Sequence, residues 1–105
     1  MKYQKSGTTL IFYFEGEFDN YQVASIKEEC SALIALHQPK TLKLDFRDVT
    51  FVDSTGIGFV LGRYKQMQKH QGEVILCNVS KTNQTLFHMS GLFRIIRLEQ
   101  SEVAR

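Results

Sequence analysis

Apolar residues follow two different periods along the chain, and the switch between them predicts strands interleaved with helices. Residues 41–46 alternate between apolar and charged side chains, as a half-buried strand does. Residues 23–37 instead repeat apolar positions at helical spacing, and Pro39 ends that pattern. Strands that alternate with helices are typical of an α/β fold with a mostly parallel sheet.

Extending this interpretation along the chain predicts the order β-β-α-β-α-β-α-β in one domain spanning residues 1–105. We expect a central mixed, mostly parallel sheet flanked by helices. The expected elements are an edge strand over residues 2–5, a strand over 8–15 ended by Gly16, a helix from an Asn20 cap to His37, a strand over 41–46 with an apolar approach at 49–52, a helix from residue 54 to about His70, a strand over 73–78, a helix from a Ser80 cap to Met89, and a strand over 93–98. The apolar stripe of the second helix consists of Ile57, Val60, Leu61, Tyr64 and Met67.

Composition narrows the classes of partner. The formal net charge of +2, with basic and acidic residues interleaved, argues against nucleic acid. No window is long and apolar enough to cross a membrane, and residues 1–7 lack the apolar stretch of a signal peptide, so we expect a cytoplasmic protein with no membrane partner. Cys30 and Cys77 have no metal-ligand spacing, and we expect two buried, reduced thiols and no metal or cofactor.

The segment Asp53-Ser54-Thr55-Gly56 lies where an expected strand meets an expected helix. In open α/β sheets, sites gather at the carboxyl ends of strands, and helix N-termini offer unpaired N–H groups with a partial positive charge. The location therefore favours an anion or a phosphoryl group. If Asp53 caps the helix, Ser54 takes its first position with the hydroxyl pointing outward; otherwise Ser54 is itself the cap.

Gly56, Gly58 and Gly62 all fall within the first turns of this helix. Each costs about 1 kcal/mol relative to alanine in a helix interior, so some other requirement must retain them. Gly58 and Gly62 lie one turn apart beside Thr55, and a face without side chains allows close approach either of the rest of the domain or of another protein. Because the apolar stripe already accounts for the buried side, we favour a partner, which Ile57 can also touch from the first turn.

A second segment, Glu17-Phe18-Asp19-Asn20, follows another strand and should lie near Ser54 in space. Asp19 and Asn20 are ordinary cap or turn residues, and they are also placed to contact whatever meets Ser54.

An enzyme is the alternative class. A nucleophilic serine needs an adjacent base, but His37 and His70 fall at the far ends of their helices, and only a structure can place His88. The sequence has no nucleophile elbow around Ser54, no phosphate-binding P-loop and no dinucleotide fingerprint. We therefore expect no catalytic site, with a small hydrolase as the less favoured reading.

Several stretches together resemble the anti-sigma factor antagonists of spore-forming bacteria, members of the STAS domain family. The resemblance covers nearly the whole chain. The matching stretches are Gly16-Glu17-Phe18-Asp19, Phe51-Val52-Asp53-Ser54-Thr55-Gly56-Ile57-Gly58, Leu61-Gly62-Arg63-Tyr64-Lys65-Gln66, Met89-Ser90-Gly91-Leu92-Phe93 and Ile95-Ile96-Arg97.

The resemblance implies a partner switch. Such antagonists bind an anti-sigma factor that is also a serine kinase, which frees the sigma factor; the kinase then phosphorylates the antagonist and releases it, and a metal-dependent serine phosphatase resets the cycle. The family's acceptor falls on Ser54, and Thr55 occupies a position where the family often has a second serine. The resemblance is strongest to antagonists of the anti-sigma F type, which act in sporulation. General stress-response antagonists and non-phosphorylated STAS modules, such as lipid- or transporter-associated ones, remain alternatives. Family members usually carry a longer final helix, which we expect to be shortened or absent here.

Overall fold

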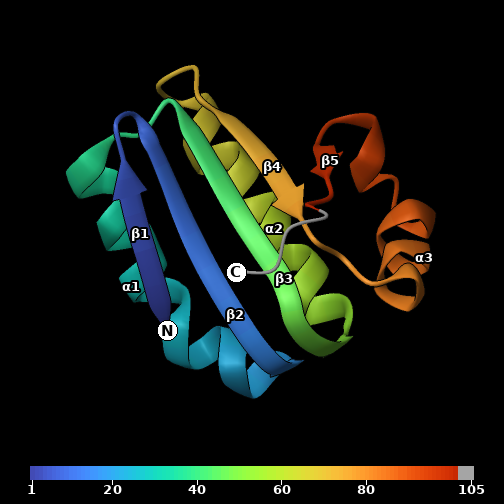
Figure 1. Ribbon diagram of the computed structural model, residues 1–105. Helices are drawn as coiled ribbons and strands as arrows, with labels where there is room; N and C mark the ends of the chain where they lie inside the picture. The colour runs from blue at the N-terminus through green and yellow to red at the C-terminus, as the bar shows by residue number, and fades with distance from the viewer. Residues whose placement is uncertain (102–105) are drawn as a thin grey trace.

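The five strands lie side by side in the order in which they occur in the chain (Figure 1). A computed structural model describes residues 1–101. Its elements are β1 (Lys2–Ser6), β2 (Thr9–Phe18), α1 (Asn20–His37), β3 (Thr41–Val52), α2 (Ser54–Gln68), β4 (Glu73–Cys77), α3 (Lys81–Met89), a 3-10 helix η1 (Leu92–Arg94) and β5 (Arg97–Glu99). The predicted order and the mixed, mostly parallel sheet are confirmed.

Among the strand pairs of residues 1–101, only the first is antiparallel. β1 and β2 form a hairpin whose turn contains Gly7 at a φ of 59°, a left-handed conformation that glycine adopts without steric cost. The other three pairs are parallel, so each needs a crossover, and α1, α2 and α3 supply these. The carboxyl ends of β2, β3 and β4 consequently point towards the same end of the sheet.

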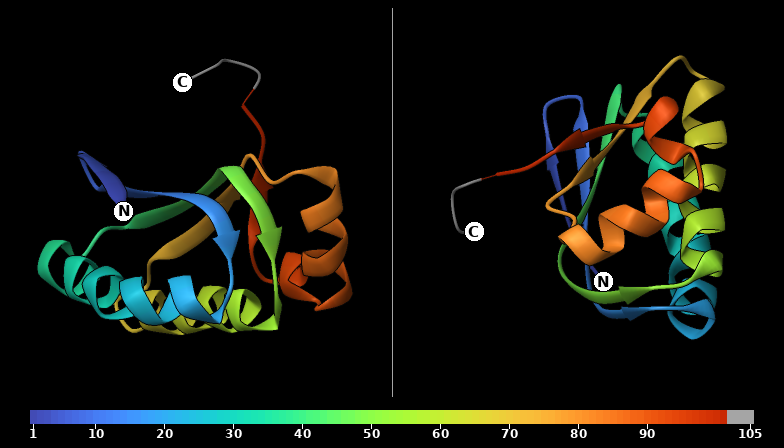
Figure 2. Two further views of the ribbon diagram at one scale, coloured as in Figure 1. Left: turned by 90° about the horizontal axis from the view of Figure 1, so that it is seen from below. Right: turned by 90° about the vertical axis from the view of Figure 1, so that its right-hand side faces the viewer.

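Helices α1 and α2 cover one face of the sheet, and within residues 1–101 no helix covers the other face (Figure 2). Between the helices and the sheet lies a cluster of aromatic rings that meet edge-on or tilted, with centroids 4.7 to 5.7 Å apart. Such contacts add about 0.5–1.5 kcal/mol per pair beyond the burial of their area. The rings are Phe14, Phe18, Phe46 and Phe59. Within residues 1–101, no helix is long and apolar enough to span a bilayer.

Both central strands run further than their sequence patterns indicate. β2 continues past Gly16 to Phe18, so the prediction that Gly16 ends the strand is wrong. Gly16 has a φ of 74° and lies at an irregularity where the β2–β3 register shifts. A bulge adds a residue to one strand without ending the pairing. β3 likewise joins the predicted strand over 41–46 and the apolar approach at 49–52 into one element.

The buried side of α2 is broader than its predicted stripe. Val60 and Met67 are buried as expected, whereas Ile57, Leu61 and Tyr64 are only partly buried. The additional buried residues are Gly56, Phe59 and Arg63. α2 packs against the sheet and also against its neighbour α1, where the Gln66 side chain donates to the Ser31 carbonyl across the two helices at 3.0 Å.

The last predicted strand is wrong over most of its length. Phe93 lies in η1, and only residues 97–99 pair with β4. The apolar residues of this stretch are explained by packing, since the Phe93 ring lies 6.1 Å from Phe87 and Ile96 is buried. The third helix ends at Met89 as predicted, and the Met89 side chain is 78% exposed. The expectation about a shortened final helix concerns residues 102–105, which lie outside the described residues.

Candidate functional site

Two strand ends bring the two predicted segments together. Phe18 and Val52 are register partners at the ends of β2 and β3, and the Asp53 N–H donates to the Phe18 carbonyl at 3.4 Å. Helices α1 and α2 therefore begin next to each other at the lower end of the molecule as drawn in Figure 1. The prediction that the segment around Asp19 lies beside the segment around Ser54 is confirmed.

Asp53 is the N-cap of α2. Its Oδ1 accepts from the N–H groups of Thr55 at 2.9 Å and Gly56 at 3.2 Å. Ser54 therefore occupies the first helical position, and the alternative in which Ser54 is the cap is wrong. The Ser54 side chain is exposed and its hydroxyl makes no hydrogen bond to any of residues 1–101. A hydroxyl with neither a capping role nor a partner is available to an incoming group.

The start of α1 repeats this arrangement. Asp19 caps the helix, and its Oδ1 accepts from the N–H groups of Tyr21 and Gln22, both at 3.1 Å. Asn20 is thus the exposed first residue of the helix rather than its cap, which corrects the prediction. A carboxylate suits the N-cap position of these two helices because it accepts charge-assisted hydrogen bonds from two backbone N–H groups at the positive end of the helix.

Gly56 lies inside the domain rather than on its surface. A Cβ at this position would lie 2.8 Å from both Phe18 Cδ2 and Val52 Cγ1 and 3.0 Å from the Phe18 carbonyl oxygen. The absence of a side chain lets α2 sit close against the ends of β2 and β3. Gly56 is buried in the free domain, and its predicted contact with a partner stays a prediction.

Gly58 and Gly62 differ from Gly56. A Cβ at either position would meet nothing within 4 Å, and Gly58 is exposed. Internal packing therefore gives no reason for glycine at these two positions. Together with the exposed Ser54 and Thr55, they form a surface that we call the glycine face, with the partly buried Ile57 lying between them in the sequence.

Two exposed aromatic side chains border this end of the sheet, and sequence reasoning assigned them no role. Tyr21 in the first turn of α1 is 80% exposed and Phe51 near the end of β3 is 50% exposed. The apolar run at 49–52 predicted a strand but not which of its side chains would face outward. Large exposed aromatic rings are enriched among residues that anchor protein–protein contacts.

The histidines of residues 1–101 do not form a base–nucleophile pair with Ser54. No hydrogen bond joins a histidine to Ser54 within residues 1–101, and His70 Nε2 lies 2.8 Å from the Pro39 carbonyl oxygen at the opposite end of α2. His88 lines an open cavity beside α3. Among the same residues, no group of three or more His, Cys, Asp or Glu side chains could hold a metal ion.

Both cysteines are free and buried, as predicted. Burial raises the pKa of the Cys30 thiol to about 12 and that of Cys77 to about 11, because a thiolate loses its hydration inside the domain. Neutral, shielded thiols are poor nucleophiles and poor metal ligands.

Comparison with known proteins places this arrangement among related folds. Residues 1–104 match the STAS domain. The chain is 33% identical over 94 residues to an anti-sigma F factor antagonist of Paenibacillus polymyxa, covering 90% of this chain and 80% of that protein. It is 31% identical over 93 residues to an anti-sigma-B factor antagonist of Listeria monocytogenes, covering 86% and 78% of the two chains.

Two solved structures of SpoIIAA resemble the whole domain. The unphosphorylated form of this anti-sigma factor antagonist superimposes with a TM-score of 0.84 at 29% identity, over 96% of this chain and 88% of that one. The phosphorylated form, from Bacillus, superimposes with a TM-score of 0.75 at the same identity, over 96% and 91% of the two chains. Because the domain match spans nearly the entire sequence and the relatives agree with it in fold, the chain belongs to the STAS domain family.

Proposed function

We propose that this chain is an anti-sigma factor antagonist that binds an anti-sigma factor when Ser54 is unmodified and releases it when Ser54 is phosphorylated. The observation that carries the proposal is the exposed, uncommitted Ser54 hydroxyl at the start of α2, beside a face kept free of side chains. In this proposal the catalytic groups for phosphorylation come from the partner and not from this chain. An anti-sigma factor that is also a serine kinase brings ATP, Mg²⁺ and the catalytic base.

The contact surface consists of residues from both helix starts and from the exposed side of α2. Close approach to Gly58 and Gly62 would bury backbone that is now open, as small-residue faces allow. The remaining contact residues in the proposal are Asp19, Asn20, Asp53, Ser54, Thr55 and Ile57. Both relatives and both SpoIIAA structures support a protein-binding role for this family member.

Phosphorylation switches binding rather than folding. A phosphate on Ser54 adds about −1.5 to −2 charges, which takes the formal charge of the chain from +2 to about zero. At the positive end of α2 that charge is tolerated, with a gain of typically about 0.3–1 kcal/mol. The amides of Thr55 and Gly56 are already bonded to the Asp53 carboxylate, so the phosphate finds a like charge beside it and few donors.

In the bound state the same dianion would meet the partner surface. Enclosing an unpaired charge in a protein interface costs several kcal/mol, and the phosphate group also fills space that the contact needs. The phosphorylated form therefore dissociates while its fold persists. A metal-dependent serine phosphatase then restores the hydroxyl and the binding surface.

The test is a binding measurement with purified anti-sigma factor kinases. The unmodified chain should bind in the presence of ADP by calorimetry, and the Ser54-phosphorylated chain should bind at least about tenfold more weakly, which corresponds to about 1.4 kcal/mol. Ser6→Ala removes an exposed hydroxyl at the opposite end of the sheet, so it serves as the matched control and should keep both behaviours. Equal binding of the two forms would contradict the switch and favour a STAS module that is not regulated by phosphorylation.

The same binding experiment, done with anti-sigma F and anti-sigma-B kinases, tests whether the chain acts in sporulation or in the general stress response. Relatives of both the anti-sigma F and the anti-sigma-B type share about a third of the sequence with this chain. We favour the sporulation type on the matching stretches around Ser54, with action in the cytoplasm, where sigma factors work. Tighter binding to an anti-sigma-B kinase than to an anti-sigma F kinase would instead assign the chain to the general stress response.

A further inference from the structure

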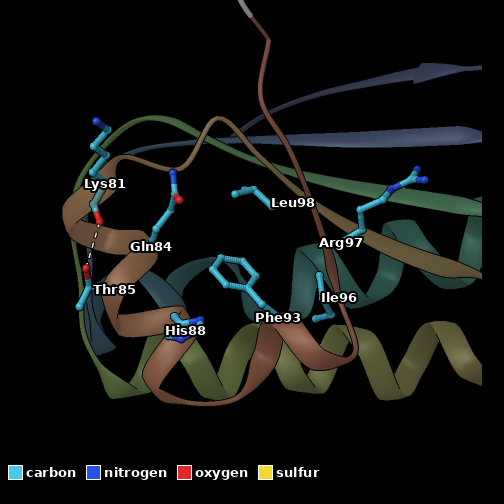
Figure 3. A pocket seen from close by; sticks show the side chains of 8 residues that line it. All are labelled: Lys81, Gln84, Thr85, His88, Phe93, Ile96, Arg97 and Leu98. Carbon is cyan, nitrogen blue, oxygen red and sulfur yellow. Dashed lines mark hydrogen bonds between the residues drawn. The ribbon is translucent and has the colours of Figure 1, made fainter.

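A concave surface at the β5 edge of the sheet shares no residue with the glycine face. α3, η1 and β5 surround an open cavity of about 530 Å³, within the range of about 300–1,000 Å³ usual for ligand sites. Figure 3 shows the Phe93 ring between the two walls, with residues of α3 on one side and Leu98 of β5 on the other (Figure 3). Leu92, immediately before Phe93, is buried, so the floor is held by the core.

The groove has an apolar floor and a polar wall. Phe93, Ile96 and Leu98 supply the apolar side. On the wall formed by α3, the Thr85 hydroxyl donates to the Lys81 carbonyl at 3.2 Å. This combination suits a ligand that has an apolar part to insert and a polar part to leave at the rim.

The charged residues that line the groove, Lys81 and Arg97, are basic, while Glu73 lies beside Arg97 and Glu99 follows Leu98 in β5. Residues 79–98 contain Lys81, Arg94 and Arg97 and not one Asp or Glu, although the whole chain has 11 acidic residues. The Arg97 side chain points away from the Phe93 ring in Figure 3, and its Nη2 lies 3.8 Å from a carboxylate oxygen of Glu73, so it contributes at the rim. Surface charge of one sign draws a partner of the opposite sign.

Exposed apolar side chains occur in the same segment. Met89 at the end of α3 is 78% exposed and Ile95 after η1 is 48% exposed. Basic side chains mixed with exposed apolar ones fit either an acidic peptide or an anionic membrane surface. The concave shape favours the acidic peptide over the membrane, because a protruding peptide side chain can fill a groove and a smooth membrane surface cannot.

We propose that the groove between α3 and β5 is a second docking site, which takes an acidic segment of a partner protein and inserts one apolar side chain of that segment over Phe93. This inference does not depend on the phosphorylation of Ser54. It gives the chain two separate surfaces, one at the starts of α1 and α2 and one at the edge of the sheet.

The test uses a fluorescein-labelled peptide in which one leucine is flanked on both sides by aspartates and glutamates. We expect saturable binding, with amide shifts in NMR spectra confined to residues 79–98. The double variant Lys81→Glu, Arg97→Glu should bind about fivefold or more weakly, because two exposed charge pairs contribute about 0.2–1 kcal/mol each. The matched control Lys27→Glu, Lys69→Glu changes the net charge equally on exposed residues elsewhere and should bind within about twofold of the parent chain.

Three results would overturn the proposal. The first is the absence of saturable binding at millimolar peptide. The second is equal binding of a peptide in which serine replaces the leucine, since attraction would then be electrostatic only. The third is binding to phosphatidylserine vesicles that the peptide does not displace, which would assign the surface to membranes. Melting curves of both double variants verify that the fold is kept.

Discussion

The three glycines of α2 respond differently to a methyl group, and this difference tests the glycine face directly. Gly58→Ala and Gly62→Ala add a Cβ that meets nothing within 4 Å, so neither variant creates a clash. Both positions lie inside a helix, where alanine is favoured over glycine by about 0.8–1 kcal/mol. Each substitution should therefore stabilise the free domain.

Gly56→Ala should do the opposite. Its Cβ would lie 2.8 Å from two side-chain carbons and 3.0 Å from a backbone oxygen of Phe18, which cannot move without disturbing β2. Overpacking of this kind costs about 1–3 kcal/mol, which outweighs the gain in helix propensity. We expect Gly56→Ala to lose about 1 kcal/mol of unfolding free energy or more.

Thermal and urea unfolding followed by circular dichroism measure the predicted gain in unfolding free energy for Gly58→Ala and Gly62→Ala and the predicted loss for Gly56→Ala. For a domain of about 100 residues, 1 kcal/mol corresponds to about 4–8 °C in Tm. Gly62→Ala then serves as the reference for Gly62→Leu, which should have a similar Tm but bind the kinase more weakly. If Gly58→Ala or Gly62→Ala lowers the Tm, or if Gly62→Leu binds unchanged, then that face does not serve a partner.

Three further predictions concern charge. Ser54→Asp should weaken kinase binding about tenfold or more by calorimetry while the Tm stays within about 2 °C, and a collapsed fold would refute a switch that acts on binding alone. Arg63→Met should raise the free energy of unfolding in urea by about 1 kcal/mol or more, because Arg63 is buried and, within residues 1–101, its Nε and Nη1 have no hydrogen-bond partner, while its guanidinium lies 4.8 Å from the Phe59 ring centroid; a loss of stability would contradict this. Burial raises the pKa values of Cys30 and Cys77 to about 12 and 11 in the folded state, so their contribution to stability is complete below about pH 9 and is lost as the pH rises towards those values. In Cys77→Ala the free energy of unfolding should therefore fall less steeply with pH above about pH 9 than in the parent chain, and an equal slope for the two proteins would contradict the raised pKa.

The sequence predicted most of the fold because its helices and strands carry clear periods. The alternation at residues 41–46 and the helical repeat ended by Pro39 appear in the structure as β3 and α1. The prediction of a strand over 93–98 was wrong because Phe93 and Ile96 are apolar in order to pack within an irregular segment, and not because they alternate along a strand. A period cannot separate these two causes when a segment is this short.

The site was predicted in position but not in detail. The sequence indicated that Ser54 lies at a strand-to-helix junction beside Asp19, and both caps appear there. What it could not assign was the direction in which each glycine faces. Gly56 turned inward because α2 begins directly against Phe18, a contact between residues far apart in the sequence, while Gly58 faces outward. Only the three-dimensional packing separates a glycine needed by the domain from one left free for a partner.

The most direct measurement is peptide mapping by mass spectrometry after the chain is incubated with an anti-sigma factor kinase and ATP. We predict one phosphoryl group per chain, located on Ser54, lost in Ser54→Ala and retained in Thr55→Ala. Phosphate on Thr55 or on any other residue, or no incorporation by any kinase that binds the chain, would contradict the claim that the exposed hydroxyl at the start of α2 is the acceptor.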